Sequence, residues 1–256
     1  MLFDSHVHLN DDTLYNRIDE VLLEARQNDV THFLCVGYDV SSSKRAIEIS
    51  RRYEFVYAAI GFHPSEAKKI SDEDFKWLEE NLKQPKVVAI GEIGLDYYWD
   101  SSFKDIQKNV FIKQIELGNK YQLPLIIHMR EATLDTYELL KNNKDLSLRG
   151  IMHCYSGSLE SMKQFIHLNM MISLAGPVTF KNAKIPKEIA KEIDLRDLLI
   201  ETDAPYLAPM PFRGKPNESK YLKFIAFEIA SIKGLTYEEV GKKTFQNACE
   251  LFKINI

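Results

Sequence analysis

Long apolar runs, a leader segment and a cysteine framework are all lacking in this sequence. None of its 256 residues belongs to an apolar stretch near the roughly 18 residues that a membrane helix needs, so we expect no membrane association. The start of the chain has no basic flank followed by an apolar stretch, so we expect no signal peptide. The three cysteines, Cys35, Cys154 and Cys249, are an odd number without framework spacing, which favours the reducing cytoplasm.

An excess of positive charge is also lacking. The formal net charge of −4 argues against a protein that coats nucleic acid electrostatically, but not against an enzyme that holds a few phosphates through metals and local basic residues. There is no linker, low-complexity stretch or internal repeat, and a hydrophobic fraction of 45% is enough for a sizeable core. We therefore predict a single domain over residues 1–256, and nothing in the sequence indicates an obligate protein partner.

Eight short apolar runs alternate with helical patterns along the chain, at a spacing of about 20 to 40 residues. Their near-continuous apolar character is typical of parallel strands that are buried on both faces. No glycine-rich phosphate loop follows the first run, which counts against an open dinucleotide-binding sheet. Eight units in about 250 residues instead predict an α/β fold of the (β/α)8 TIM-barrel type. The runs lie at 1–8, 31–37, 55–61, 87–91, 125–128, 150–152, 170–174 and 198–200.

His6 and His8 stand at the end of the first run, where side chains two residues apart point to the same side of a strand. In a barrel of this type the C-terminal ends of all strands meet at one face. Six candidate ligands are more than the three that a catalytic zinc typically takes, so they predict two divalent metal ions bridged by a carboxylate, that of Glu92. The other four candidates end or follow later runs: Glu92, His128, His153 and Asp203.

Each of these residues also has a simpler interpretation. A His-x-His pair is common enough to be incidental, and a glutamate at a strand end can pair with a lysine. The recurrence of histidines and carboxylates at the ends of later runs favours the metal site. Of the remaining histidines, His63 directly follows the third run, whereas His32 and His167 are interpreted as structural.

Six motifs in order along the chain resemble those of the TatD-type metal-dependent deoxyribonucleases of the amidohydrolase superfamily. The resemblance covers essentially the whole chain. It rests on Asp4-Ser5-His6-Val7-His8, Gly61-Phe62-His63-Pro64, the segments 91–98 and 123–128, His153-Cys154-Tyr155-Ser156-Gly157 and the segment 201–207.

The resemblance implies a complete set of site residues. It implies that His63 lies beside the metals and contacts the phosphate. Two departures, Met129-Arg130-Glu131 in place of Ser-Arg-Asp and Ser219 in place of a proline, leave the predicted ligands intact and concern substrate preference. The residues that match the family's metal ligands are His6, His8, Glu92, His128, His153 and Asp203.

The predicted chemistry is hydrolysis of a phosphodiester. Water between two cations loses its proton near neutral pH, and Asp203 is placed to accept or orient that proton. His63, Arg130 and Arg213 would add electrostatic stabilisation around the phosphate. The simpler interpretations are a capped turn for His63 and surface ion pairs for the two arginines.

Three aromatic residues, Tyr97, Tyr98 and Trp99, follow Glu92 in a loop at the same face. They either stack nucleobases, as in single-strand binders, or pack the loop onto the barrel. Without a broad basic surface, cleavage at a strand end is favoured over a grip on a long duplex. We therefore predict an exonuclease on single-stranded or frayed DNA ends.

Two alternatives stay open from the sequence. The same dinuclear site could hydrolyse a small amide, lactone or phosphoester, since barrel loops set the substrate. The second alternative is a metal-dependent scaffold that catalyses no reaction. Imidazole suits zinc, manganese or cobalt, and the resemblance also implies magnesium, so the identity of the metal is not predicted.

Overall fold

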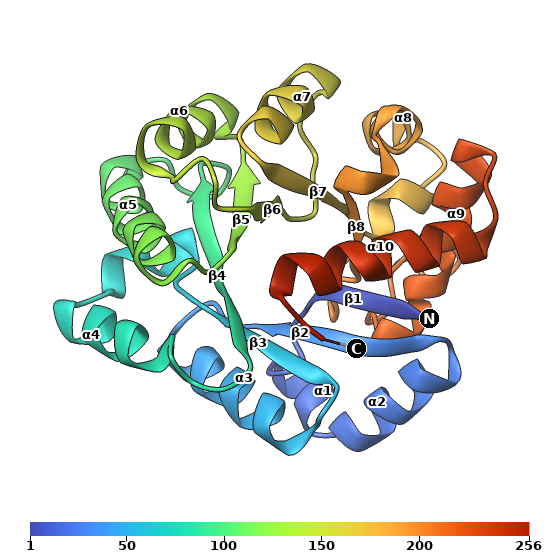
Figure 1. Ribbon diagram of the computed structural model, residues 1–256, viewed down its shortest axis with the longest axis horizontal. Coiled ribbons are helices and arrows are strands. Elements are labelled where there is room, and N and C mark those ends of the chain that lie inside the picture. The colour runs from blue at the N-terminus through green and yellow to red at the C-terminus, as the bar shows by residue number, and fades with distance from the viewer. Residues whose placement is uncertain (256) are drawn as a thin grey trace.

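The computed structural model describes residues 1–255, so Ile256 of the predicted domain lies outside the described residues. Eight strands form one parallel sheet in chain order, and helices surround it (Figure 1). The prediction of an α/β TIM barrel is confirmed. The strands are β1 (Leu2–Val7), β2 (Val30–Val36), β3 (Val56–Ile60), β4 (Val87–Asp96), β5 (Leu125–Arg130), β6 (Gly150–Met152), β7 (Met170–Leu174) and β8 (Leu198–Ile200).

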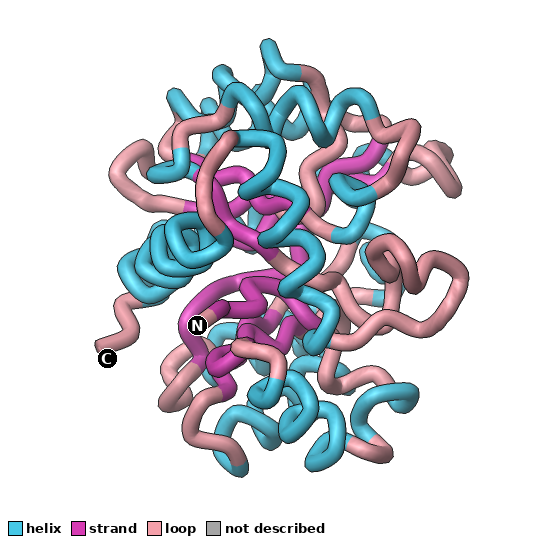
Figure 2. Tube along the Cα trace, turned by 90° about the vertical axis from the view of Figure 1, so that its right-hand side faces the viewer, coloured by secondary structure: helices cyan, strands magenta, loops and turns pink. Residues whose placement is uncertain are grey.

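Helices follow the strands around the barrel. Figure 2 shows the N-terminus on the left of the barrel and long loops extending to the right. Within residues 1–255, no helix is both long and apolar enough to cross a membrane. The α-helices are α1 (Asp12–Tyr15), α2 (Ile18–Gln27), α3 (Val40–Arg52), α4 (Asp72–Asn81), α5 (Lys104–Tyr121), α6 (Thr133–Asn143), α7 (Leu159–His167), α8 (Lys184–Glu192), α9 (Leu222–Lys233) and α10 (Tyr237–Phe252).

The first and last strands meet through hydrogen bonds at their C-terminal ends. The backbone N–H of Asp203 donates to the carbonyl of His6 at 2.9 Å, and that of His8 donates to the carbonyl of Ala204 at 2.8 Å. The Ser5 hydroxyl donates to the carbonyl of Ile200 at 3.0 Å. These bonds bring the start of the chain against the segment after β8.

The interior of the barrel is filled by apolar side chains from all eight strands, including Phe3, and α10 covers its N-terminal end (Figure 1). Phe245 of α10 packs into this core. His32 belongs to the same layer, because its ring stacks on Phe3 at 5.8 Å and meets Phe245 edge-on at 5.2 Å. This packing supports the structural role predicted for His32.

β4 is longer than the sequence predicts. We expected it to end at Gly91 with Glu92 just beyond, but the strand continues to Asp96 and contains Glu92. Gly94 permits this extension, because it has φ 138° and a Cβ there would lie 2.0 Å from the carbonyl oxygen of His128 on β5. Glycine ordinarily indicates the end of a strand, but here it allows β4 and β5 to stay paired.

Helix α8, between β7 and β8, was not expected from the sequence. Its Pro186 lies in the first turn, where the missing N–H costs nothing because those groups have no partner within a helix. Ile189 and Ala190 bury one face of the helix. The N-terminus of α8 follows the β7 loop and therefore lies on the face where the strand ends converge.

Candidate metal centre

The strand ends bring seven predicted residues into one cluster at the C-terminal face of the barrel. Five of them are buried, and His63 and His128 are partly exposed. The seven are His6 (β1), His8 (after β1), His63 (after β3), Glu92 (β4), His128 (β5), His153 (after β6) and Asp203 (after β8).

One oxygen of Glu92 faces the histidines of the first strand. Glu92 Oε2 lies 3.5 Å from Nε2 of His6 and 3.8 Å from Nε2 of His8. Asp203 Oδ1 lies 3.7 Å and 3.3 Å from the same two nitrogens, which are 3.4 Å apart. Four donors placed tetrahedrally at about 2.1 Å from a metal are about 3.4 Å from one another. The spacing of His6, His8 and Asp203 therefore suits one metal ion, with Glu92 Oε2 within 3.8 Å of both histidine nitrogens.

The other oxygen of Glu92 faces a second set of donors. Glu92 Oε1 lies 2.8 Å from Nδ1 of His128 and 2.9 Å from Nε2 of His153. Those two nitrogens are 3.4 Å apart. Within residues 1–255 the ion-pair partners of Glu92 are histidines, so its pairing with a lysine is not what the structure shows.

Hydrogen bonds on the far side of the ring decide where His8, His128 and His153 present a lone pair. His8 Nδ1 lies 3.0 Å from the carbonyl oxygen of Val36, which can only accept. Nδ1 therefore carries the proton, and neutral His8 directs the lone pair of Nε2 toward Asp203.

Two carboxylates that the sequence analysis did not assign hold the other pair of histidines. Asp96 Oδ2 lies 3.1 Å from Nε2 of His128, and Glu201 Oε1 lies 3.1 Å from Nδ1 of His153. Each carboxylate accepts the ring proton, so each neutral ring directs its other lone pair at Glu92. Both residues lie within quoted motifs. Their position at or just after the C-terminal end of a strand is the signal that could have indicated them.

At the centre of the cluster, histidine lone pairs thus face carboxylate oxygens. Because all of these atoms accept hydrogen bonds, cations or protons must lie between them. Burial lowers the pKa of His153, but the charges of Glu92 and Glu201 raise it well above its ordinary value. Burial raises the pKa of Glu92, but the charge of His153 and hydrogen bonds from His128 and His153 hold it well below its ordinary value. The donor set fits divalent cations, which would take the place of these protons.

His63 differs from the other histidines because it presents a proton. The backbone N–H of Ser65 donates to His63 Nδ1 at 3.1 Å, so the proton of the neutral ring is on Nε2. Burial, together with the charge of His128, lowers the pKa of His63 to about 3, which keeps the ring neutral. Its Nε2 lies 3.7 Å from Glu92 Oε1. His63 is therefore arranged as a hydrogen-bond donor at the edge of the cluster.

Asp203 is positioned by the first strand. It has a left-handed backbone with φ 55°, and its neighbour Thr202 is tied to Asp4 of β1. The Asp4 carboxylate accepts the backbone N–H of Thr202 at 2.9 Å and its hydroxyl at 2.6 Å. Burial raises the pKa of Asp4 to about 7 despite these bonds.

Arg130 and two aromatic residues form a stack beside the cluster. The Arg130 guanidinium lies 3.8 Å from the ring centroid of Tyr98 and 5.4 Å from that of Trp99. The two rings meet edge to face at 4.8 Å and are 53% and 77% exposed. Both rings are therefore open to solvent on part of their surface.

Tyr97 and Arg213 lie differently from the other predicted site residues. The Tyr97 hydroxyl donates to Asp135 on α6 at 2.7 Å, so this ring packs the loop onto the barrel. Arg213 is exposed, and its guanidinium lies 4.5 Å from the ring centroid of Phe180. Within residues 1–255, no hydrogen bond or ion pair joins either residue to Glu92 or its histidines.

Comparison with known proteins agrees with this arrangement. A family model described as TatD related DNase matches residues 3–253. The chain belongs to the TatD family of metal-dependent hydrolases. It is 49% identical over 255 residues to the uncharacterized metal-dependent hydrolase YabD of Bacillus subtilis, covering 100% of both chains. It is 34% identical to the uncharacterized metal-dependent hydrolase YcfH of Escherichia coli, covering 99% of this chain and 96% of the relative.

A solved structure shares the fold almost completely. YjjV, described as a TatD homolog from Escherichia coli, superposes with a TM-score of 0.95 at 27% identity, covering 99% of this chain and 98% of the other. The resemblance to the TatD family that the six sequence motifs indicated is confirmed.

Proposed function

We propose that this TatD-family protein is a divalent-metal-dependent deoxyribonuclease that removes nucleotides from single-stranded or frayed DNA ends. The observation that carries the proposal is the position of Glu92, whose two oxygens face two separate donor sets 2.8–3.8 Å away. Dinuclear centres of this kind are common in enzymes that cleave phosphodiesters. The description of the family model as a DNase supports the same bond type.

The two donor sets would hold two divalent metal ions. Nitrogen and carboxylate ligands suit zinc or manganese, and magnesium is the third candidate. Such ions, when bound, acidify a water molecule and neutralise charge on the phosphate. The first set is His6, His8, Asp203 and Glu92 Oε2, and the second is His128, His153 and Glu92 Oε1.

Asp203 is the general base of the proposed reaction. Burial raises its pKa, but the hydrogen bond with His8 and the charges of the surrounding histidines lower it below its ordinary value. Asp203 is therefore ionised at neutral pH and can accept a proton from the attacking water. Its backbone bond to His6 fixes it beside the first donor set.

His63 and Arg130 contact the phosphate in this proposal. The Nε2 proton of His63 faces the cluster, so it can donate to a non-bridging oxygen as charge develops there. Arg130 supplies a permanent positive charge at the end of β5. Arg213, on the loop after β8, is proposed to hold phosphate at the rim.

Tyr98 and Trp99 provide the base-binding surface. An exposed pair of rings that already stacks an arginine offers a platform for a nucleobase of any identity. The bond of the Tyr97 hydroxyl to Asp135 holds the start of the same loop against α6. A single platform beside a single catalytic centre favours a strand end over a long duplex.

The test uses chelator-stripped protein on short single-stranded DNA labelled at either end, with Mg²⁺, Mn²⁺ or Zn²⁺ added back. We expect metal-dependent shortening from one end, and no shortening by the Asp203→Ala variant. DNA that survives in every metal, while a small amide, lactone or phosphoester is hydrolysed, would support a dinuclear hydrolase and exclude the nuclease. Bound metal without turnover on any of these substrates would indicate a scaffold.

A further inference from the structure

Two segments beside the metal centre carry positive charge and no carboxylate. They are residues 175–187, which follow β7, and residues 204–217, which follow Asp203; together we call them the β7–β8 surface. The acidic residues Glu188, Asp203 and Glu218 border the two segments. Within the segments the charged residues are all basic: Lys181, Lys184, Lys187, Arg213 and Lys215.

The two segments form one continuous surface because they are packed together. The backbone N–H of Met210 donates to the hydroxyl of Thr179 at 2.8 Å. The carbonyl of Leu207 lies so close to Gly176 that a Cβ there would be 1.8 Å away. Charges on the two loops therefore act on the same region of solvent.

Most of these charges are free to bind an external anion. Lys181, Lys184, Arg213 and Lys215 are exposed, and within residues 1–255 only Lys187 pairs with a carboxylate, that of Glu228 at 2.8 Å. Lys184 lies in the first turn of α8, which contains no acidic residue. A cation at the positive end of a helix is unfavourable unless an anion binds there.

Apolar side chains are interleaved with these charges. Tyr206, Leu207 and Met210 are 53%, 40% and 36% exposed, although they lie within five residues of one another and next to the metal centre. The ring of Tyr206 lies 5.9 Å from that of His8. Exposed aromatic and apolar groups among unpaired basic residues are typical of surfaces that track a single nucleic-acid strand.

We propose that the β7–β8 surface binds the backbone of single-stranded DNA beyond the phosphate that is cleaved. This inference rests on the proposed function, and it adds that the substrate is a polymer whose chain leaves the metal centre over β7 and β8. Lys181, Lys184 and Lys215 neutralise successive phosphates, and Tyr206 contacts the nucleotide next to the metals. Although the net charge of the chain is −4, this surface would attract DNA on one side of the site.

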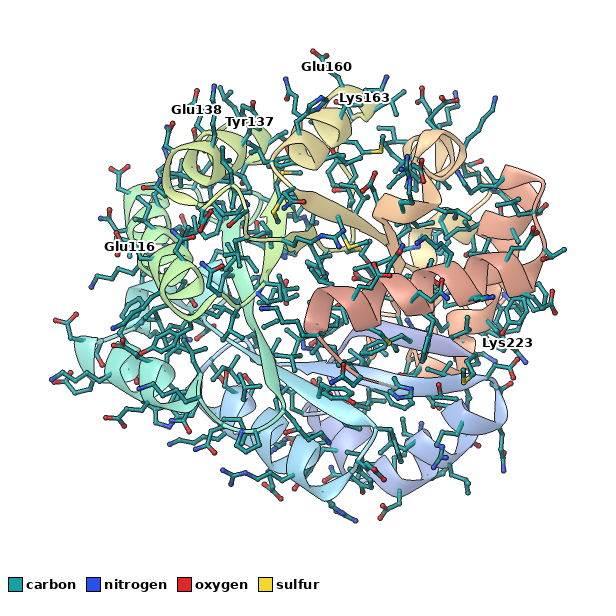
Figure 3. All side chains as sticks on the ribbon, viewed as in Figure 1. Glu116, Tyr137, Glu138, Glu160, Lys163 and Lys223 are labelled. Carbon is teal, nitrogen blue, oxygen red and sulfur yellow. The ribbon has the colours of Figure 1, made fainter. Side chains whose placement is uncertain are left out.

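The test compares two triple variants by binding a fluorescein-labelled 20-nucleotide single strand at several salt concentrations. The first is Lys181→Ala, Lys184→Ala and Lys215→Ala. The control, Lys76→Ala, Lys163→Ala and Lys242→Ala, removes the same charge from exposed lysines on α4, α7 and α10. Lys163 points away from the barrel on α7 (Figure 3).

We expect the first variant to bind the strand about tenfold more weakly near physiological salt and to lower the slope of log affinity against log salt by about 2, because each single-strand phosphate contact contributes about 0.7. We also expect its KM to rise more for the 20-mer than for a dinucleotide. An unchanged slope in the first variant, or an equal change in the control, would overturn the β7–β8 surface even if the protein cleaves DNA. Strand binding with the expected slope change but no cleavage by the metal-loaded wild type would retain the surface and reject the nuclease. No binding of the strand by the wild type would reject both.

Discussion

The Asp96 carboxylate lies 3.1 Å from Nε2 of His128, while the other ring nitrogen of that histidine lies 2.8 Å from Glu92. Asp96 thus fixes both the tautomer and the orientation of the ring. Such a partner raises the basicity of a metal-binding imidazole without touching the metal.

Replacing Asp96 should weaken metal binding without unfolding the protein. We expect Asp96→Asn to lower metal affinity about 10- to 100-fold, since the amide retains the size of the side chain but loses its charge. Competition with a chromophoric chelator measures this affinity. Asp100→Asn, at an exposed aspartate in the loop that follows β4, is the matched control and should bind metal like the wild type.

Glu92→Gln should weaken metal binding more than Asp96→Asn does. The amide nitrogen has no lone pair to donate to a metal ion, so one of the two donor sets loses its shared oxygen. We expect the variant to lose at least one equivalent of metal and its activity to fall on the order of 1000-fold. Elemental analysis after dialysis and turnover on labelled DNA test this. Glu160→Gln, on the outer face of α7 in Figure 3, should change neither quantity.

His63→Ala should separate activity from metal content. Because His63 presents a proton rather than a lone pair, we expect kcat to fall about 100-fold while the metal content stays that of the wild type. Loss of a metal equivalent in this variant would show instead that His63 is a ligand. The exposed His167 of α7 provides the control, and His167→Ala should retain full activity.

Metal binding should release protons near neutral pH. Burial lowers the pKa of His8, but its bond with Asp203 raises it above the ordinary value of 6.5. Burial likewise lowers the pKa of His128, whereas its bonds with Asp96 and Glu92 raise it above that value. Histidines with raised pKa values hold protons in the metal-free protein, so metal affinity should increase as pH rises above 6.5. Calorimetry in two buffers of different ionisation enthalpy counts the protons, and equal heats in both would contradict the expectation.

Two glycines should respond very differently to alanine. Gly94→Ala combines an unfavourable φ with a clash against the carbonyl of His128, and we expect it to cost about 4 kcal/mol of unfolding free energy or more. Gly214→Ala has φ 88° but no atom within 4 Å of the new Cβ, so it should cost only about 1 to 2 kcal/mol. Urea denaturation of both variants measures the difference. Equal losses would show that the β4–β5 approach is not what requires Gly94.

Much of the candidate site could be predicted from the sequence because the convergence of strand ends is a property of the barrel itself. Once eight apolar runs indicate a (β/α)8 barrel, a histidine or carboxylate at the end of a run is placed at one face. His6, His8, His128, His153 and Asp203 all satisfied that rule.

Local patterns were insufficient where long-range packing decided the outcome. Gly91 and Gly94 indicate a strand end by their propensity, yet the close passage of β5 keeps them in β4 and places Glu92 inside the strand. Helix α8 was not predicted because of Pro186. A proline in the first turn of a helix and a proline that breaks a helix look alike in sequence.

The sequence by itself determined the barrel and the set of groups able to bind metal, because both depend on residue type and on position along each strand. The tertiary structure decided which histidines share an oxygen of Glu92 and which ring nitrogen each presents. It also assigned Asp96 and Glu201 as partners of His128 and His153. Those relationships depend on distances and hydrogen bonds between strands far apart in the chain, and no local pattern encodes them.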